Sequence, residues 1–335
     1  MNITKAIISQ FTTHKGKNTD KRLWANIFTK FFGKLAVTII LLGLSYVILY
    51  PLIYCVSQAI RLPADMYDPT VIYIPKHYTL QNFKDAWDFL EFPKILMNTV
   101  NVSLWPTLLQ LVTCALAGYG FARFKFKFKG LLFTLVLLTF IVPPQTISVT
   151  TYTTFRYFDP LYICSGLNMV GALPEAYIDI TDTLWSFFLP ALFASGLKSG
   201  LFIFVYRQFF RGIPKELEEA AYIDGCGSIM TFIKIIVPNA VPAFVTVFLL
   251  SLVWYYNDYF TVPLFLPKTE VLSASLNDMF TNMTTVGGLY QNVDTILIYP
   301  IWRAGILLYI MPLLIIFLLF QKKFTESIAR SGIVG

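Results

Sequence analysis

The sequence has very little of the residue types that build most metal sites and enzyme active sites. Only two histidines, His14 and His77, occur in 335 residues, so a metal site built on imidazole ligands is not expected. The four cysteines lie far apart in the sequence, at Cys55, Cys114, Cys164 and Cys226. This spacing excludes a CxxC metal or redox motif and argues against a disulfide framework.

A nucleotide-binding loop is also missing. No run of the form GxxxxGK[ST] occurs in the sequence, so the chain has no P-loop and is not expected to hydrolyse ATP by itself. A membrane enzyme acting on lipid would need clustered acids, histidines or serines near one interface, and the sequence contains no such constellation. We therefore expect a protein that is not an enzyme and that binds no cofactor of its own.

Charge is scarce and apolar residues are abundant. Charged residues make up 13% of the chain, about half of the roughly 25% that is usual in soluble domains. Hydrophobic residues make up 56%, and 31 Phe and 19 Tyr provide the aromatic content that is typical of the belts at membrane surfaces. The composition predicts a membrane protein in contact with lipid, with no soluble domain and no nucleic-acid partner.

Six apolar segments are long enough to cross a hydrocarbon core of ~30 Å, which takes about 20 helical residues. They lie at roughly 35–57, 97–121, 130–150, 184–206, 236–256 and 304–321. The predicted fold is an all-α membrane protein with six transmembrane helices in one membrane domain, 35–335. A basic arm, 1–34, precedes it and lacks the features of a cleaved signal peptide. The arm is predicted either to form an amphipathic surface helix near 22–32 or to be a disordered tail.

The distribution of positive charge predicts the orientation. With the N-terminus inside, 18 of the 26 Lys and Arg residues fall in inside segments and seven in outside segments, whereas six acids lie inside and thirteen outside. The positive-inside rule therefore favours both termini in the cytoplasm. The loop ARFKFKFKG (122–130) is the clearest inside anchor. Segments 151–183 and 257–303 are then external loops, with room for short interfacial or re-entrant helices.

A charged loop, GIPKELEEAAYIDGCGSIMTFIKIIVP (212–238), connects the fourth and fifth spans on the inside. Pro214 suits a first helical position, and the acids that follow it favour the positive end of a helix; these are Glu216, Glu218 and Glu219. A helix of about 11 residues would be about 16 Å long, too short to span a membrane. Gly225 or Gly227 would end it, and Ser228 would cap a second helix that Pro238 ends or kinks.

An apolar stripe on this short helix leaves two interpretations open. Ile213, Leu217 and Ala221 recur at i, i+4 and i+8, which places them on one narrow face. Small residues on that face suit close docking into a groove on another protein. The alternative is a helix that lies at the lipid headgroups, as in many cytoplasmic loops.

The loop resembles a known family signature. In EAAYIDGCGSIMTFIKIIVP (219–238), an E-A-A triplet is followed after three residues by Gly225, and nine further residues precede I-x-V-P. This pattern resembles the E-A-A signature of permease subunits of ATP-binding-cassette (ABC) importers, with Val237 in place of the usual leucine. The resemblance implies a coupling element that seats in the ATP-hydrolysing subunit, formed here by Glu219, Ala220, Ala221, Asp224 and Gly225.

Further stretches resemble the maltose-type, carbohydrate-uptake branch of that family. They are YPLIYCVSQAI, IPKHYTLQNFKDAW, NTVNVSLWPTLLQLVTCALAGYGFARFKFKFKG, YRQFFRGIPKELEEAA, WYYNDYFTVPLFL and the tail SGIVG. The resemblance implies a bacterial cytoplasmic-membrane location and four kinds of partner. These are two ABC subunits that bind ATP and Mg²⁺, a second, non-identical permease, an external solute-binding protein and membrane lipid. The arm before the first span and the segment 151–183 are longer than the family pattern.

Polar and aromatic residues near span breaks are candidates for a sugar pathway. Trp254, Asn257 and Asp258 offer an aromatic face for stacking together with amide and carboxylate hydrogen-bonding groups. Gln145 follows the Pro143-Pro144 break in the third span, and transporter sites tend to lie at such breaks. The same residues also fit an aromatic belt with a helix cap.

Lys198 is a further candidate, because a charge inside a span faces protein or water. External acids could pair with it, namely Glu175, Asp179 or Asp182. Alternatively the span begins late and Lys198 reaches out to the interface. Gly196 and Gly200 form a GxxxG pattern around it, which permits close approach of another helix.

The sequence thus predicts a permease that imports a sugar or oligosaccharide with ATP-hydrolysing partners. The same architecture could import another solute, such as a polyamine or glycerol phosphate. An ion-driven carrier would need acids within the spans or internal repeats, and only Asp258, at the end of a span, comes near that requirement.

Overall fold

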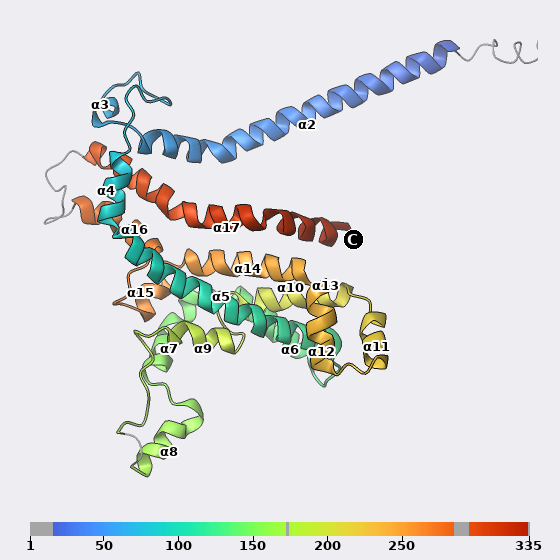
Figure 1. The fold of residues 1–335 in the computed structure, drawn as a ribbon, viewed down its shortest axis with the longest axis vertical. Helices are drawn as coiled ribbons and strands as arrows, with labels where there is room; N and C mark the ends of the chain where they lie inside the picture. The colour runs from blue at the N-terminus through green and yellow to red at the C-terminus, as the bar shows by residue number, and fades with distance from the viewer. Residues whose placement is uncertain (1–15, 172–173, 285–294, 334–335) are drawn as a thin grey trace, which may run out of the picture.

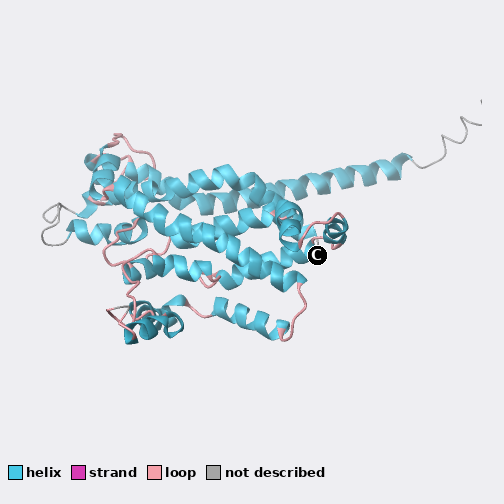
Figure 2. Ribbon diagram, turned by 60° about the horizontal axis from the view of Figure 1, so that its bottom comes forward, coloured by secondary structure: helices cyan, strands magenta, loops and turns pink. Residues whose placement is uncertain are grey.

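The computed structural model describes residues 16–171, 174–284 and 295–333, and these residues form an α-helical protein. Within them the only β pairing consists of two isolated bridges, Arg61 with Tyr78 and Phe158 with Ile178. Figure 2 shows the helices running side by side, with the loops gathered at the two ends of the bundle. The all-helical prediction is therefore confirmed, as expected where lipid forces every backbone group to bond within its own segment.

Three helices are long and apolar enough to cross a membrane: Phe28–Ala59, Phe92–Arg123 and Thr295–Lys322. The first belongs to α2 (Gly16–Ala59), the second is α5 (Phe92–Arg123) and the third lies mostly in α17 (Tyr299–Ile333). These helices match the predicted first, second and sixth spans. They are extended at their ends beyond the apolar segments, because polar residues also continue a helix once its apolar part has formed.

Two helix pairs are each bent at a short break. Helices α6 (Lys129–Ile141) and α7 (Pro144–Arg156) meet at 100°, and the run Ser228–Asn239 meets α14 (Val241–Tyr256) at 78°. Each pair has the length and composition of one span, which gives up to five spans among the described residues. Pro143 at the first bend and Pro242 just after the second explain the breaks, because proline cannot donate the backbone hydrogen bond that would continue the helix.

The predicted fourth span, 184–206, is not a single helix. It consists of α9 (Trp185–Leu192) and α10 (Ser199–Gly212), separated by a non-helical segment at 193–198. Ala194 and Lys198 in this segment have φ angles of 52° and 58°, a left-handed conformation that interrupts a right-handed helix. The prediction of one continuous helix here was wrong, because a length and hydropathy criterion does not register local backbone conformation.

The interpretation of residues 22–32 also changes. They form neither a separate surface helix nor a tail, because α2 continues without a break from Gly16 to Ala59. Every residue from 28 to 51 in this helix is exposed, and α2 diverges from the bundle along most of its length in Figure 1. Residues 1–15 lie outside the described part of the chain.

Helix α5 lies at the centre of the bundle, where it packs against α9, α10 and α14. Its buried side chains follow a helical repeat and include several polar residues: Thr99, Ser103, Thr107 and Gln110. Helix α17 packs against α2, α14 and the external helices α4 (Gln81–Phe89) and α16 (Leu272–Thr284). Buried polar groups must be hydrogen-bonded. The polar side chains of α5 therefore indicate the positions at which hydrogen bonds hold the bundle together.

The remaining short elements lie at the two ends of the bundle (Figure 1). At one end are α11 (Glu216–Ile223), α12 (Ser228–Thr231), η2 (Phe232–Ile236) and α13 (Val237–Asn239). At the other are α3 (Pro63–Met66), α15 (Thr261–Phe265) and η3 (Thr295–Leu297). Elements η1 (Pro160–Tyr162) and α8 (Ile163–Met169) extend away from the bundle beyond α7. The predicted external segments 151–183 and 257–303 therefore do contain short helices, in the residues that the structure describes.

Candidate functional site

The short helix predicted in the charged loop is α11, Glu216–Ile223. It ends at Gly225, whose φ of +84° is left-handed and suits glycine. The Cys226 N–H donates to the Ala221 carbonyl (2.9 Å) and the Gly225 N–H to that of Tyr222 (3.1 Å). These are the paired bonds of a Schellman termination. Of the two glycines proposed to end the helix, Gly225 does so, and α11 has eight residues rather than about eleven.

Glu218 anchors α11 to the end of α5. Its Oε1 lies 2.5 Å from Nε of Arg123, and both side chains are at most 10% exposed. The Tyr119 hydroxyl lies 3.3 Å from the other carboxylate oxygen, and Arg123 also donates to the Ile213 carbonyl at 2.8 Å. The sequence pattern places Glu218 with its neighbours among the acids that favour the positive end of the helix. It does not reveal that Glu218 attaches α11 to α5. The signal available was Arg123 in the basic inside loop, which needs a counter-ion once buried.

The anchoring defines which face of α11 is free. Ala221, Glu218 and Ile213 are buried against the bundle, and Leu217 is 41% exposed. The apolar stripe of Ile213, Leu217 and Ala221 is therefore not a free face for docking or for lipid headgroups, because two of its three residues are buried within the chain. Glu219, Ala220, Asp224 and Gly225 are all exposed, and so is Ile223, at 86%. Four of the five predicted coupling residues thus lie on the free face or at its end, while Ala221 packs inward.

A second helical segment follows and leads back into the bundle. It comprises α12 (Ser228–Thr231), η2 (Phe232–Ile236), which is a π-helix, and α13 (Val237–Asn239). Gly227 rather than Ser228 occupies the cap position of α12, without a side-chain hydrogen bond. Pro238 lies in α13, directly after the π-helix. Proline has no backbone N–H, so the regular hydrogen bond to the carbonyl four positions earlier is missing, and this accounts for the π-helical bonding just before it. The helical run ends at Asn239, one residue after Pro238, so the predicted end of the second helix at this proline is confirmed to within one residue.

The break in the fourth span borders a cavity of about 380 Å³. Its walls come from α6, α7, α9, α10, α14 and α15, and among its lining residues are Thr139, Ser148, Ser186, Gly196, Lys198 and Tyr255. This volume falls within the ~300–1,000 Å³ of pockets that hold small molecules. The cavity is therefore the candidate solute site in the described part of the chain.

Lys198 lines this cavity and its ammonium lies between two aromatic rings. Its Nζ is 4.9 Å from the ring centroid of Trp254 and 5.2 Å from that of Phe140. Two of the acids predicted as its partners are engaged elsewhere: Asp182 pairs with Lys268 at 2.5 Å and Asp179 accepts from Thr181. The structure thus brings together two of the predicted pathway residues, Lys198 and Trp254, through a cation–π contact.

The other three predicted pathway residues lie elsewhere. Asp258 accepts the backbone N–H groups of Phe260 and Thr261, so it caps the turn before α15. Asn257 donates to the Val253 carbonyl at 2.8 Å and accepts from the Tyr309 hydroxyl of α17. Gln145 is exposed at the start of α7, and none of the three lines the cavity. For Asp258, the helix-cap alternative describes its contacts.

Gln110 of α5 holds the broken span in place and was not identified from the sequence. It is fully buried, and its Nε2 donates to the Leu197 carbonyl (2.8 Å) and to the Ser199 hydroxyl (2.7 Å). Ser251 of α14 donates to its Oε1 at 3.2 Å. One amide therefore satisfies backbone and side-chain groups on both neighbouring segments, which is what a non-helical stretch within a membrane protein requires.

Two glycines permit the close packing around this break. A Cβ on Gly196 would lie 2.3 Å from the Tyr255 hydroxyl oxygen, and one on Gly200 would lie 2.5 Å from the Val136 carbonyl oxygen. Both distances are too short for any side chain. The close approach predicted from the GxxxG pattern is confirmed, but the two glycines face different elements, and Gly196 is not in a helix.

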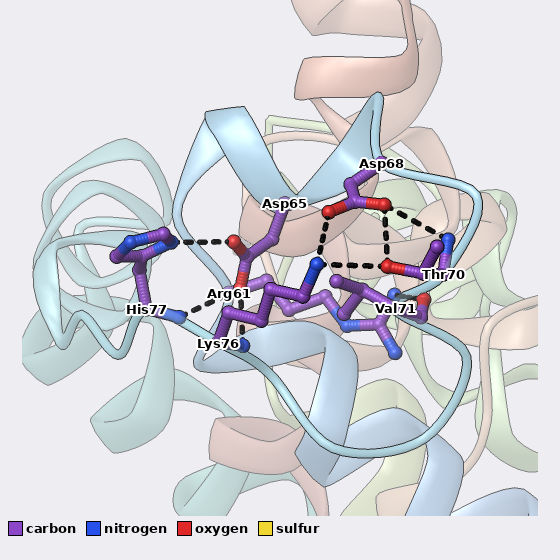
Figure 3. Close-up of polar contacts among 7 residues, drawn as sticks. All are labelled: Arg61, Asp65, Asp68, Thr70, Val71, Lys76 and His77. Carbon is purple, nitrogen blue, oxygen red and sulfur yellow. Dashed lines mark hydrogen bonds and ion pairs between the residues drawn. The ribbon is translucent and has the colours of Figure 1, made fainter.

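A polar cluster fixes the loop between α2 and α4 (Figure 3). Arg61, 3% exposed, donates to the Val71 carbonyl at 3.0 Å. The buried Asp65 carboxylate accepts the backbone N–H groups of Lys76 (2.7 Å) and His77 (2.8 Å), and its other oxygen lies 2.8 Å from His77 Nδ1. The His77 backbone N–H and imidazole together hold the pKa of Asp65 below its usual value. The loop is therefore a rigid structure at this end of the bundle.

Comparison with known proteins places the chain in a family. The family of binding-protein-dependent transport system inner membrane components matches residues 114–329. The probable ABC transporter permease protein YurM of Bacillus subtilis (strain 168) is 28% identical over 320 residues, covering 95% of this chain and 93% of the relative. The maltodextrin transport system permease protein MdxG of the same organism is 26% identical over 310 residues, covering 91% and 98%.

A solved structure shares the fold. It is a chain of a bacterial ABC transporter involved in the import of the acidic polysaccharide alginate, with a TM-score of 0.64 and 19% sequence identity, covering 88% of this chain and 97% of that one. The chain belongs to the family of binding-protein-dependent transport system inner membrane components, the membrane-spanning permease subunits of ABC importers.

Proposed function

We propose that this chain forms half of the translocation pathway of an ATP-driven importer for a sugar or oligosaccharide. A second, non-identical permease would complete the pathway, two ABC subunits would bind ATP and Mg²⁺, and an external binding protein would deliver the solute. The location would be the bacterial cytoplasmic membrane. The name of the maltodextrin relative supports a sugar as the solute, and the family supports the partners.

The observation that carries this proposal is the way α11 is presented. The helix lies at one end of the bundle, beyond the ends of α5 and α10 (Figure 1). One face is fixed by the buried Glu218–Arg123 pair, while Glu219, Ala220 and Asp224 on the other face are exposed. A rigid, small-residue surface on a short helix is suited to docking in a cleft of another protein, since Ala220 permits close approach.

The anchoring also indicates how α11 would act on the pathway. Arg123 is the last residue of α5, and Gln110 on the same helix holds the break next to the cavity. A displacement of α11 would therefore be transmitted along one continuous helix to the cavity wall. ATP binding at the partner subunits and access to the solute site would then be coupled through a shared free energy.

The proposed topology has six spans with both ends in the cytoplasm. Counting the interrupted α9–α10 segment as the fourth span gives six crossings. The free end of α11 then lies on the same side as the basic loop 122–130, in agreement with the positive-inside rule. In Figure 1 the start of α2, the end of α17 and α11 all lie towards the same end of the molecule, as this topology requires.

The coupling role is tested by two substitutions at the free face. Gly225→Pro would force φ from +84° to about −65° and destroy the helix end, and Glu219→Lys reverses a charge on the docking face. Both are expected to abolish ATP-dependent uptake in proteoliposomes while the complex still assembles. Glu175→Lys, the same charge reversal on an exposed external residue, is the matched control and should transport normally.

The partners are tested by affinity purification of the chain from its native membrane in mild detergent, followed by mass spectrometry. Recovery of a P-loop ATPase and a second permease is the expected result. Wild-type uptake rates in both coupling variants would refute the coupling role. Isolation of the chain alone, with solute transport that needs no ATP, would refute the importer itself and favour an ion-driven carrier. Uptake of a polyamine or glycerol phosphate instead of a sugar would refute only the assignment of the solute.

A further inference from the structure

The cavity at the break of the fourth span has an unusual charge composition. Among the described residues that line it, Lys198 is the only one with a charged side chain, and no Asp or Glu lines it. The wall also carries hydroxyl groups that can bond to oxygen-rich solutes, contributed by Thr139, Ser148, Thr151, Ser186, Ser195 and Ser199. The site thus combines one cation with several neutral hydrogen-bonding groups.

Among the described residues, Lys198 has aromatic neighbours but no ion-pair partner. Its ammonium lies 4.9 Å and 5.2 Å from the ring centroids of Trp254 and Phe140. Aromatic faces attract a cation, but they leave its positive charge uncompensated. A charge within a span normally pairs with an opposite charge or faces a water-filled path, so Lys198 has the environment of a binding group.

Two acids beside helices of the cavity wall, one just before α9 and one just after α14, are engaged elsewhere. Asp182 pairs with Lys268 of the external loop, and Asp258 caps the turn before α15 through two backbone N–H groups. Neither residue is among those that line the cavity. An anion that enters the cavity would therefore meet Lys198 without competition from a carboxylate of its wall.

We infer that this cavity is an anion subsite and that the transported solute carries a carboxylate or a similar anionic group, as in a uronic-acid oligosaccharide. Lys198 binds the anionic group, Trp254 holds the lysine side chain in place, and the hydroxyls of the wall bond to the sugar oxygens. The inference rests on the proposed function, because it specifies the solute class of the same pathway. It assigns to this chain, rather than to its partner permease, the contact that selects for charge.

The test compares an acidic and a neutral trisaccharide in the complete transporter. The complex with its native partners is reconstituted in phosphatidylcholine vesicles, so that no anionic lipid headgroup can occupy the site. ATP-dependent uptake of labelled trigalacturonate and of labelled maltotriose is then measured for the wild type, Lys198→Met and Lys198→Arg. Lys94→Met, which removes an external lysine paired with Glu91 at 2.7 Å, is the matched control.

Wild-type uptake is expected to favour trigalacturonate. Loss of a charged hydrogen bond should lower its uptake in Lys198→Met by about tenfold or more, with maltotriose uptake unchanged or increased. Lys198→Arg should retain most of the acidic uptake, and Lys94→Met should match the wild type. Equal amounts of assembled complex in each preparation would show that the loss is not a folding defect.

Two results would overturn the inference while leaving the importer intact. One is ATP-dependent uptake of maltotriose but not of trigalacturonate by the wild type. The other is acidic uptake that Lys198→Met leaves unchanged. The absence of ATP-dependent uptake for both sugars, together with no ATPase in the purified complex, would instead refute the proposed function and this inference with it.

Discussion

The buried ion pair between Glu218 and Arg123 provides the sharpest quantitative prediction. The 2.5 Å contact joins two side chains that are 7% and 10% exposed, so removal of one partner leaves the other charge buried and uncompensated. Breaking such a pair typically costs about 3–5 kcal/mol. Glu218→Ala should therefore weaken the attachment of α11 to α5 by that amount, whereas Glu218→Gln, which keeps an acceptor for Arg123, should cost about 1–3 kcal/mol.

This magnitude decides whether α11 remains attached. Since each 1.4 kcal/mol changes an equilibrium tenfold, a loss of about 3–5 kcal/mol lowers the ratio of attached to detached helix by a factor of roughly 10² to 4 × 10³. A detached helix can still bind the ATPase, but it no longer moves α5. ATP hydrolysis by the complex should then continue while ATP-dependent uptake falls by about tenfold or more.

The assay measures hydrolysis and uptake on the same proteoliposomes for Glu218→Ala, Glu218→Gln and Glu216→Ala. The last variant is the control, because Glu216 also lies in the first turn of α11 but is exposed. It removes the same charge from the same helix end without breaking the buried pair. The double variant Glu218→Arg with Arg123→Glu exchanges the two charges of the pair and should restore part of the coupling. Full coupling in Glu218→Ala would refute the reasoning.

Three further predictions follow from the packing and the polar contacts. Gly196→Ala should destabilise the complex, because its Cβ would lie 2.3 Å from the Tyr255 hydroxyl oxygen; Tyr255→Phe, which removes that oxygen, should restore part of the lost Tm in the double variant. Gln110→Leu should lower stability by about 1–3 kcal/mol by leaving buried groups at the break without partners, and a Tm equal to the wild type would contradict the network described above. The bonds to His77 lower the pKa of Asp65 in the folded state. The stability that the Asp65 carboxylate contributes is therefore present above its unfolded pKa of about 3.9 and is lost as the pH falls below that value. Limited proteolysis of the loop after α2 should accelerate in acid for the wild type, and Asp65→Asn should abolish this pH dependence.

The coupling loop shows which structural features a local sequence pattern can predict and which it cannot. The acids after Pro214, and Gly225, are local signals that predicted the helix and its end. Pro214 was predicted as the first helical residue, but the helix begins two residues later, at Glu216. The stripe of Ile213, Leu217 and Ala221 was predicted to dock on another protein or to lie at the headgroups, but Ile213 and Ala221 are buried within the chain. The buried face is set by Arg123, which lies 95 residues away from Glu218. No periodicity within the loop contains that information.

The pathway residues show the same limit within the membrane. The polar and aromatic residue types at 254, 257 and 258 suggested one site, yet Asn257 contacts α17 and Asp258 caps a turn. Lys198 and Trp254 do meet, because the non-helical break turns the lysine towards α14. Gln110 was overlooked because a single amide in a long apolar helix carries no pattern of its own.

The amino-acid sequence was enough to predict the membrane setting, the helical class, most of the candidate spans and the charged loop between the predicted fourth and fifth spans. These features depend on composition, on runs of about 20 apolar residues and on local turn chemistry, all of which can be read along the chain. The three-dimensional packing was needed to show that the fourth span is broken, that Gln110 holds the break and that Glu218 fixes α11. It was also needed to show that Lys198 lines the cavity with no ion-pair partner among the described residues. Each of these joins residues dozens of positions apart, and such contacts depend on how the helices pack rather than on the order of their residues.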